Sequence, residues 1–423
     1  MTESSAPEES ELAHRIGAAS VRVRPWGSLR YAQYRLLAGS GLLGSTGMQM
    51  REVVNFWVVF QFTHDFLPLA LLGSLRVLPL FALGLLGGLL ADMVDRRKIL
   101  LVGYGMSFVT TGALALLFVT GNLELWHIYA TTLVSAIATV LDGPARTALI
   151  YGSVPRSHLM NALTLASSVR QGSILIGPSI GGLLISLSGI GAAYVVTTAM
   201  YVPALAAVLL LSDPRPAEAR ARPRFGRTEL LEGIRWVVRT PVVVAFTTVD
   251  FTAMLFTSYK VLLPFYADKL GVGSAGFGFL TSAPAVGFLI GSGVLLAFGD
   301  VPRRGLAVTL GIVGYVAAVF VFALSPWFIL SLAALAAAGG FDGVSAIIRR
   351  TTLQLLVPDD IRGRATSVVQ VFTQGTSSVG LIGTGAAATV LGASGALLGG
   401  GVFALAVLAA VALRWRQMVT FRI

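Results

Sequence analysis

GLLADMVDRRK, residues Gly88 to Lys98, is a turn in which five of eleven residues are charged. It separates two long apolar runs, roughly Phe66–Leu90 and Ile99–Val119. A charged turn between two segments of membrane-crossing length has to lie in water, because unpaired charges are costly in the hydrocarbon core. The turn therefore predicts that the chain is a polytopic membrane protein.

The composition points the same way. Hydrophobic residues make up 55% of the chain and charged residues only 12%, whereas a soluble domain carries about 25% charged residues. Cysteine is absent, and the four histidines have no ligand spacing, so we expect no disulfide and no metal site. The net charge of +11 is explained by cationic loops that orient a membrane protein. We therefore expect no nucleic-acid partner and no cofactor.

A spanning helix needs about 20 predominantly apolar residues. On this criterion the sequence predicts an all-α protein with twelve transmembrane helices, over residues 33–62, 67–90, 98–119, 126–150, 159–187, 190–211, 241–267, 274–299, 305–324, 327–350, 363–389 and 393–413. Loops with and without basic residues alternate along the chain, which predicts that both termini are cytoplasmic and that the protein lies in a bacterial cytoplasmic membrane.

The chain also repeats itself weakly. GSLRVLPLFALGLLGGLLADMVDRR from Gly73 resembles GFLTSAPAVGFLIGSGVLLAFGDVPRR from Gly278, and the segments that begin at Asp142 and Asp342 form a second pair. Parallel repeats of this kind build transporters whose substrate site lies at the interface of the halves. The predicted parts are an N-terminal tail (1–30), a six-helix bundle (31–211), a cytoplasmic linker with an amphipathic helix (212–240), a second six-helix bundle (241–414) and a C-terminal tail (415–423).

The Gly88–Lys98 turn resembles the signature loop between helices 2 and 3 of the major facilitator superfamily, Gly-x-Leu-Ala-Asp-Arg-x-Gly-Arg-Lys. Gly88, Leu90, Ala91, Asp92 and Arg96 match, and Arg97 replaces the lysine. The DRR ending, Pro144-x-Arg146 and VPDDIRGR (Val357–Arg364) are similar to the enterobactin-exporter-like and macrolide-efflux-like branch. The resemblance implies a major facilitator fold and transport by alternating access, with a loop contact that forms in one conformer and breaks in the other. Asp92 can accept hydrogen bonds from a helix N-terminus or pair with Arg96, Arg362 or Arg364; the alternative is a solvated loop that sets topology.

A second motif, GPSIGG, spans Gly177 to Gly182 and includes Pro178 and Gly181. It resembles the core of the helix 5 motif of antiporters and drug exporters, and this resemblance favours export over import. Proline kinks a helix and glycine permits close helix contact. The alternative is ordinary glycine packing.

Charged residues inside predicted spans are functional candidates by default. Glu52 and Asp250, on the first helix of each half, are the preferred proton-coupling candidates, and Arg51 is a candidate partner for Glu52. Asp142 lies one helical turn from Arg146 and is expected to pair with it. Asp342 occupies the equivalent place in the second half, with Arg349 two turns away, and is a further candidate for proton coupling or gating.

The candidate cavity residues are basic, polar or aromatic residues near mid-helix. They are Arg51, Asn55, Trp57, Arg76, Arg170, Phe256, Tyr259, Lys260, Gln370 and Gln374. The basic members favour an anionic or polyphenolic cargo, such as a siderophore, over a cationic drug. Any single aromatic residue has the alternative role of helix or lipid packing.

The functional hypothesis is a secondary exporter of a small amphipathic molecule, exchanged for protons. A proton-coupled importer on the same fold is the alternative, and a membrane enzyme or receptor is a third class. The sequence has no Walker loop, nucleophile elbow or metal cluster, so we expect a transporter driven by the proton gradient. The expected partners are a small-molecule substrate and membrane lipid, and the expected functional unit is a monomer.

Overall fold

The computed structural model describes residues 26–77, 79, 95–212, 227–299, 301–358 and 361–415. Within these ranges every regular element is a helix and no strand occurs. Eight helical segments of the described chain are long and apolar enough to cross a membrane. This part of the molecule therefore has the all-α membrane architecture predicted from the sequence.

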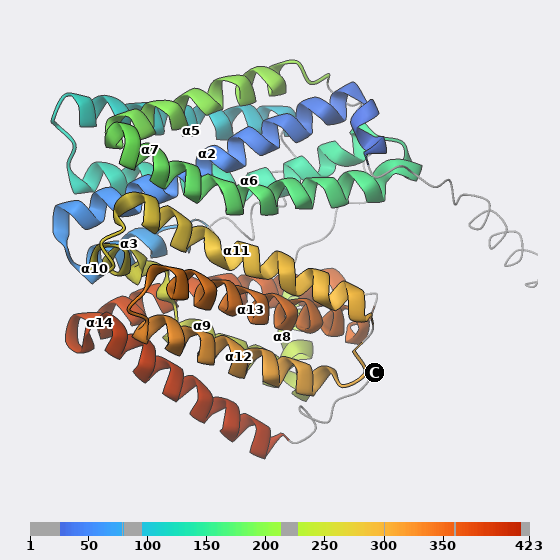
Figure 1. The fold of residues 1–423 in the computed structure, drawn as a ribbon. Coiled ribbons are helices and arrows are strands. Elements are labelled where there is room, and N and C mark those ends of the chain that lie inside the picture. The colour runs from blue at the N-terminus through green and yellow to red at the C-terminus, as the bar shows by residue number, and fades with distance from the viewer. Residues whose placement is uncertain are drawn as a thin grey trace, which may run out of the picture.

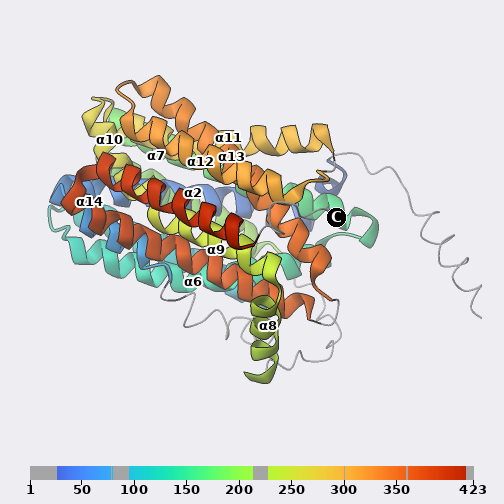
Figure 2. The same ribbon diagram turned by 90° about the horizontal axis from the view of Figure 1, so that it is seen from below.

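The helices form two groups that lie side by side (Figures 1 and 2). The first group contains η1 (Gly27–Arg30), α2 (Ala32–Thr63), α3 (Phe66–Ser74), α5 (Arg96–Val119), α6 (Leu125–Ser153), η2 (Arg156–His158) and α7 (Leu159–Leu209). The second group contains α8 (Arg227–Arg239), α9 (Pro241–Phe256), η3 (Tyr259–Leu262), α10 (Leu263–Lys269), α11 (Gly273–Phe298), α12 (Arg304–Leu324), α13 (Phe328–Leu356) and α14 (Arg362–Arg414).

Helices α7 and α14 each turn back on themselves at one glycine. Gly189 has φ +83° and Gly392 has φ +71°, a left-handed conformation that only glycine adopts at little cost. With 51 and 53 residues, each helix is more than twice as long as a single membrane crossing of about 20 residues. The two glycines therefore divide α7 and α14 into two arms each, where the sequence placed uncharged turns.

The predicted span 241–267 falls within a segment of membrane-crossing length, Pro241–Lys269, but this segment is not one continuous helix. Helix α9 ends at Phe256, and the chain then passes through η3 before α10 begins at Leu263. Pro264 stands at the start of α10, and its missing N–H removes one helical hydrogen bond to the preceding turn. Lys260 therefore lies in the short 3-10 helix η3, between two α-helices.

Several charged residues of the turns cap helices. The Asp65 carboxylate accepts a hydrogen bond from the Leu67 N–H at 3.4 Å, and that of Asp95 accepts one from the Arg97 N–H at 2.9 Å. Glu124 and His127 form a capping box at the start of α6. Free N–H groups at a helix start favour such acceptors, so the turn charges also fix where α3, α5 and α6 begin.

The two ends of the molecule differ. At the linker end, where α7 finishes and α8 lies, basic residues stand at helix ends, among them Arg97, Arg304 and Arg414. At the turn end, α2 meets α3 at His64–Asp65 and α10 meets α11 near Val272. In Figure 1 the linker end is on the right and the turn end on the left.

Candidate transport site

The two groups touch where α7 crosses α11. A Cβ atom added to Gly182 would lie 2.4 Å from the Ser274 carbonyl oxygen, and one added to Gly278 would lie 2.5 Å from the Pro178 carbonyl oxygen. No side chain fits between the two backbones at these positions. The last part of the GPSIGG motif is therefore a helix-packing surface that joins the two groups.

The same crossing carries a hydrogen bond. The Ser179 hydroxyl donates to Ser282 Oγ at 2.9 Å. The other motif glycines, Gly177 and Gly181, face α2, because added Cβ atoms would lie 2.6 Å from Gln49 Cβ and 3.3 Å from Met50 Cα. Thus the motif packs α7 against one helix of each group.

Aromatic rings close the turn end between the groups. The Trp57 ring stacks on Phe277 with centroids 5.7 Å apart. Phe265 of α10 contacts Phe60 at 4.8 Å and Phe66 at 4.0 Å. These rings lie on α2, α3, α10 and α11, so they seal the space between the two groups on that side.

The hydrophobic cores show the opposite arrangement at the linker end. One large core contains buried residues of both groups, including Val54, Leu69, Leu262 and Phe277. Toward the linker end the core divides: one cluster, around Tyr104, belongs to the first group alone, and another, around residues 353–365, belongs to α8 and the second group. The described molecule is therefore closed at the turn end, while its halves have separate cores at the linker end.

Three charged residues meet between the halves. Glu52 of α2 accepts a hydrogen bond from Arg76 Nη1 at 2.7 Å and another from Lys260 Nζ at 2.5 Å. The Glu52 side chain is only 9% exposed, whereas those of Arg76 and Lys260 are 34% and 40% exposed. Lys260 also lies 5.9 Å above the Phe56 ring. We call Glu52, Arg76 and Lys260 the central cluster.

Arg51, the candidate partner of Glu52, has other hydrogen-bond partners in the structure. Arg51 donates instead to the hydroxyl groups of Thr110 and Ser135, on α5 and α6. Adjacent residues of a helix point about 100° apart, so Arg51 faces its own group while Glu52 faces the other. Arg51 is 4% exposed and joins three helices of the first group.

A second ionic cluster lies within the second group. Arg349 Nη2 of α13 lies 2.6 Å from Asp250 Oδ1 of α9 and 3.7 Å from Asp342 Oδ1, and its Nη1 donates to Ser345 Oγ at 2.8 Å. Two carboxylates thus share one guanidinium. Asp342 has the longer contact and the more exposed side chain, 35% against 10% for Asp250, so it is the less neutralised of the two.

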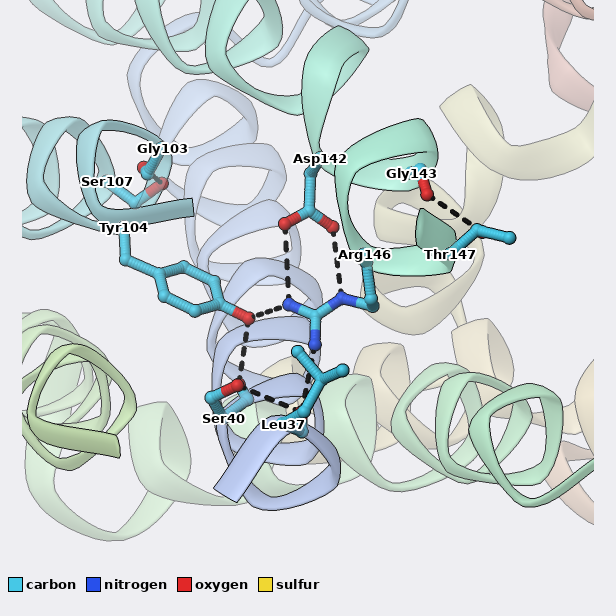
Figure 3. Close-up of polar contacts among 9 residues, drawn as sticks. All are labelled: Leu37, Ser40, Gly103, Tyr104, Ser107, Asp142, Gly143, Arg146 and Thr147. Carbon is cyan, nitrogen blue, oxygen red and sulfur yellow. Dashed lines mark hydrogen bonds and ion pairs between the residues drawn. The ribbon is translucent and has the colours of Figure 1, made fainter. Parts of the chain in front are cut away.

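The expected pair of Asp142 and Arg146 is present on α6 (Figure 3). Both Asp142 oxygens accept from Arg146 at 3.4 Å. Arg146 also donates to the Leu37 carbonyl oxygen at 3.0 Å and to the Tyr104 hydroxyl, which in turn donates to the Ser40 carbonyl oxygen at 2.9 Å. The pair thus joins α6 to α2 and α5.

Glycine makes room for this network. A Cβ added to Gly41 would lie 2.8 Å from Arg146 Nη1, and one added to Gly44 would lie 2.3 Å from the Tyr104 ring. The network is therefore built into the packing of the first group, and Asp142 is already paired in this conformation.

The predicted gating residues are described only in part. Gly88 and Asp92 lie outside the described residues, as does the Arg362 side chain. Arg96 is the first residue of α5. Arg97 donates to the carbonyl oxygens of Val208, at 3.1 Å, and Leu209 at the end of α7, and it thereby caps that helix.

Arg364 donates to Glu232 of α8 at 2.6 Å. This contact holds the linker helix against the start of α14, and Gly233 packs on the Arg364 backbone. In the described residues Arg364 thus belongs to a contact between the linker and the second group.

The predicted cavity residues are dispersed. Asn55 is buried and bonds to Thr132 at 3.3 Å and to the Tyr194 hydroxyl at 2.8 Å. Phe256 packs on Phe403, 4.6 Å away, on the second arm of α14, and therefore lies away from the central cluster.

The rest of this set is equally scattered. Tyr259 lies beside Phe322, with ring centroids 6.2 Å apart. Arg170 is exposed on α7. The side chains of Gln370 and Gln374 lie outside the described residues. Of the ten cavity candidates, the structure brings Arg76 and Lys260 together around Glu52.

Sequence reasoning missed two partners. It assigned Arg349 to Asp342 alone, although the shorter contact is to Asp250, 99 positions away along the chain. It also missed Tyr104 as a hydrogen-bond partner of Arg146. A buried tyrosine needs a hydrogen-bond partner, but the sequence contains no signal that names which helix supplies it.

Comparisons with known proteins agree with this architecture. Residues 23–420 match the family described as transmembrane secretion effector. The enterobactin exporter EntS of Shigella boydii serotype 18 (strain CDC 3083-94 / BS512) is 30% identical over 282 residues, which cover 66% of this chain and 67% of EntS. EntS of Escherichia coli O1:K1 / APEC gives the same identity and coverage.

Solved structures are similar in fold. The nucleoside transporter NupG superposes with a TM-score of 0.71 at 14% identity, covering 92% of this chain and 100% of NupG. A bacterial homologue of the human lysosomal transporter Spinster, solved in an inward-facing and unoccupied conformation, gives a TM-score of 0.70 at 14% identity and covers 93% and 98%. At these identities the likeness concerns the fold alone.

Proposed function

Since the chain belongs to the transmembrane secretion effector family of the major facilitator superfamily, within its enterobactin-exporter-like branch, we propose that it exports a small amphipathic molecule in exchange for protons. Members of this superfamily are secondary transporters, so the chain is a multi-pass membrane transporter rather than an enzyme. The proposed cargo is a drug or a siderophore-like metabolite, carried across the cytoplasmic membrane by alternating access.

The observation that carries the proposal is the asymmetry of the two ends. The halves share one core and several aromatic contacts at the turn end, and among the described residues their cores are separate at the linker end. A carrier that alternates needs a conformer closed on one side only. The basic helix ends at the linker end support a cytoplasmic orientation for that end and for both termini, so the end where the described cores separate is the one proposed to face the cytoplasm.

Proton exchange is supported by the second ionic cluster. Asp250 and Asp342 share the guanidinium of Arg349, and the charge of Arg350 also acts on Asp342. Asp342, 3.7 Å from the Arg349 guanidinium, is the carboxylate at which protonation breaks the weaker contact. We therefore favour Asp342 over Asp142, which has Arg146 to itself.

The test is transport in everted membrane vesicles, whose cytoplasmic face is outward. A macrolide, a tetracycline, a catecholate siderophore and a cationic dye are offered in turn, with a gradient that is acidic inside. We expect one of these compounds to accumulate in vesicles that contain the protein, and a protonophore to abolish the accumulation. Gradient-driven uptake into right-side-out vesicles would instead identify an importer and refute the proposal.

A further inference from the structure

The central cluster has more positive than negative charge, and its cations are the accessible members. Arg76 and Lys260 lie on either side of one carboxylate, with side chains 34% and 40% exposed, while Glu52 beneath them is 9% exposed. Two partly exposed cations that share one buried anion leave positive charge for a second anion to bind.

The cluster also joins the halves. Glu52 and Arg76 belong to the first group, and Lys260 belongs to the second, 208 positions away from Glu52 along the chain. Lys260 lies in the short 3-10 helix η3, where the chain breaks between α9 and α10. The Glu52–Lys260 contact is the ion pair that connects the two groups among the described residues.

We propose that Arg76 and Lys260 form the binding site for an anionic group of the cargo, and that Glu52 occupies this site as an internal anion when cargo is absent. The ligand class is a small organic anion with a carboxylate group, which offers two oxygens to the two cations. The inference rests on the proposed function only in naming this ligand as cargo.

Competition between the two anions links binding to conformation. When the cargo anion binds between Arg76 and Lys260, Glu52 releases Lys260 and keeps a contact with Arg76, and the charges then balance as two cations against two anions. The direct ion pair between the halves is replaced by one that runs through the cargo. The empty protein therefore holds its halves together at this point by itself, and the loaded protein does so only through its ligand.

The test measures binding without transport. The full-length protein in lipid nanodiscs is dialysed to equilibrium against radiolabelled 2,3-dihydroxybenzoate, with 2,3-dihydroxybenzamide as the neutral analogue of the same shape. Because Glu52 competes with the ligand, Glu52→Gln should bind the benzoate at least about tenfold more tightly than the parent protein. Lys260→Gln should bind it at least about tenfold more weakly, and both changes should be smaller for the benzamide, which lacks the carboxylate charge.

Matched controls come from the nearby turn end. Asp268→Asn and Lys269→Gln change the net charge by the same amounts at exposed positions and should leave the affinity for the benzoate unchanged. Equal or weaker benzoate binding by Glu52→Gln, or no binding by any variant, would overturn the proposal.

If Glu52→Gln fails to fold, Lys260→Gln and Arg76→Gln decide, because each keeps Glu52 paired with one cation. Both should lose benzoate binding, and normal binding by either would overturn the proposal. This assay measures binding without a proton gradient or a direction of transport. Failure of the export assay therefore does not refute the anion site, and failure of the binding assay does not refute export.

Discussion

The closure of the turn end depends on the absence of side chains where α7 crosses α11, and Gly182→Ala tests this. The added Cβ would lie 2.4 Å from the Ser274 carbonyl oxygen and 2.9 Å from Gly278 Cα. Ordinary contact begins near 3.4 Å, so the two helices would have to separate by about 1 Å to remove the overlap. Both obstacles are backbone atoms, which cannot rotate away as a side chain can.

Overpacking of this kind costs about 1–3 kcal/mol. The cost applies only to the conformer in which the halves meet at the turn end, because separation of α7 from α11 relieves it. The equilibrium between closed and open turn ends should therefore shift toward the open form by about 5- to 150-fold.

The chain has no cysteine, which makes disulfide cross-linking a clean assay for this contact. The hydroxyl oxygens of Ser179 and Ser282 lie 2.9 Å apart, so cysteines at both positions should cross-link under mild oxidation when the turn end is closed. Adding Gly182→Ala to this pair should lower the cross-linking rate at least about fivefold. The oxidised protein should also be inactive in vesicles and recover activity on reduction.

Gly293→Ala is the matched control. Gly293 lies on α11, and a Cβ at this position meets nothing within 4 Å. The variant therefore measures the effect of the higher helix propensity of alanine without a steric clash. Cross-linking as fast in the Gly182→Ala protein as in the Gly293→Ala protein would refute the claim that the glycine contact closes the turn end.

Three further predictions concern ion pairs. Arg146→Gln should destabilise the detergent-purified protein by about 3 kcal/mol. The double variant Arg146→Gln, Asp142→Asn should lose less stability, because no unpaired carboxylate remains. Equal unfolding temperatures of the single and double variants would contradict this. Asp342→Asn should leave cargo binding intact but remove the dependence of transport on the pH gradient, and full gradient dependence would exclude this carboxylate as the proton site. Arg364→Gln should change the free energy of unfolding by less than about 1 kcal/mol, because its partner Glu232 is half exposed. A fall in the unfolding temperature that corresponds to a larger change would contradict this and show that the contact between α8 and α14 stabilises the fold.

Much of the architecture could be predicted from the sequence. The membrane spans follow from hydropathy because lipid offers no hydrogen bonds to the backbone, and the turn residues Gly189 and Gly392 fall where the sequence has uncharged breaks. The Asp142–Arg146 pair could be predicted because a spacing of four residues places two side chains on one helical face. The break between α9 and α10 could not be predicted, since Pro264 is compatible with either a kink or an end of a helix.

The partners of the other charges were decided by the tertiary structure. Glu52 binds Lys260 of the second group, although the sequence offered its neighbour Arg51 as a candidate partner, and Asp250 binds Arg349 of a different helix. The sequence by itself determined the family and the spanning segments that the structure describes, because membrane insertion depends on local composition. Which charges meet depends on how each helix is rotated and packed, and that is a property of the assembled bundle.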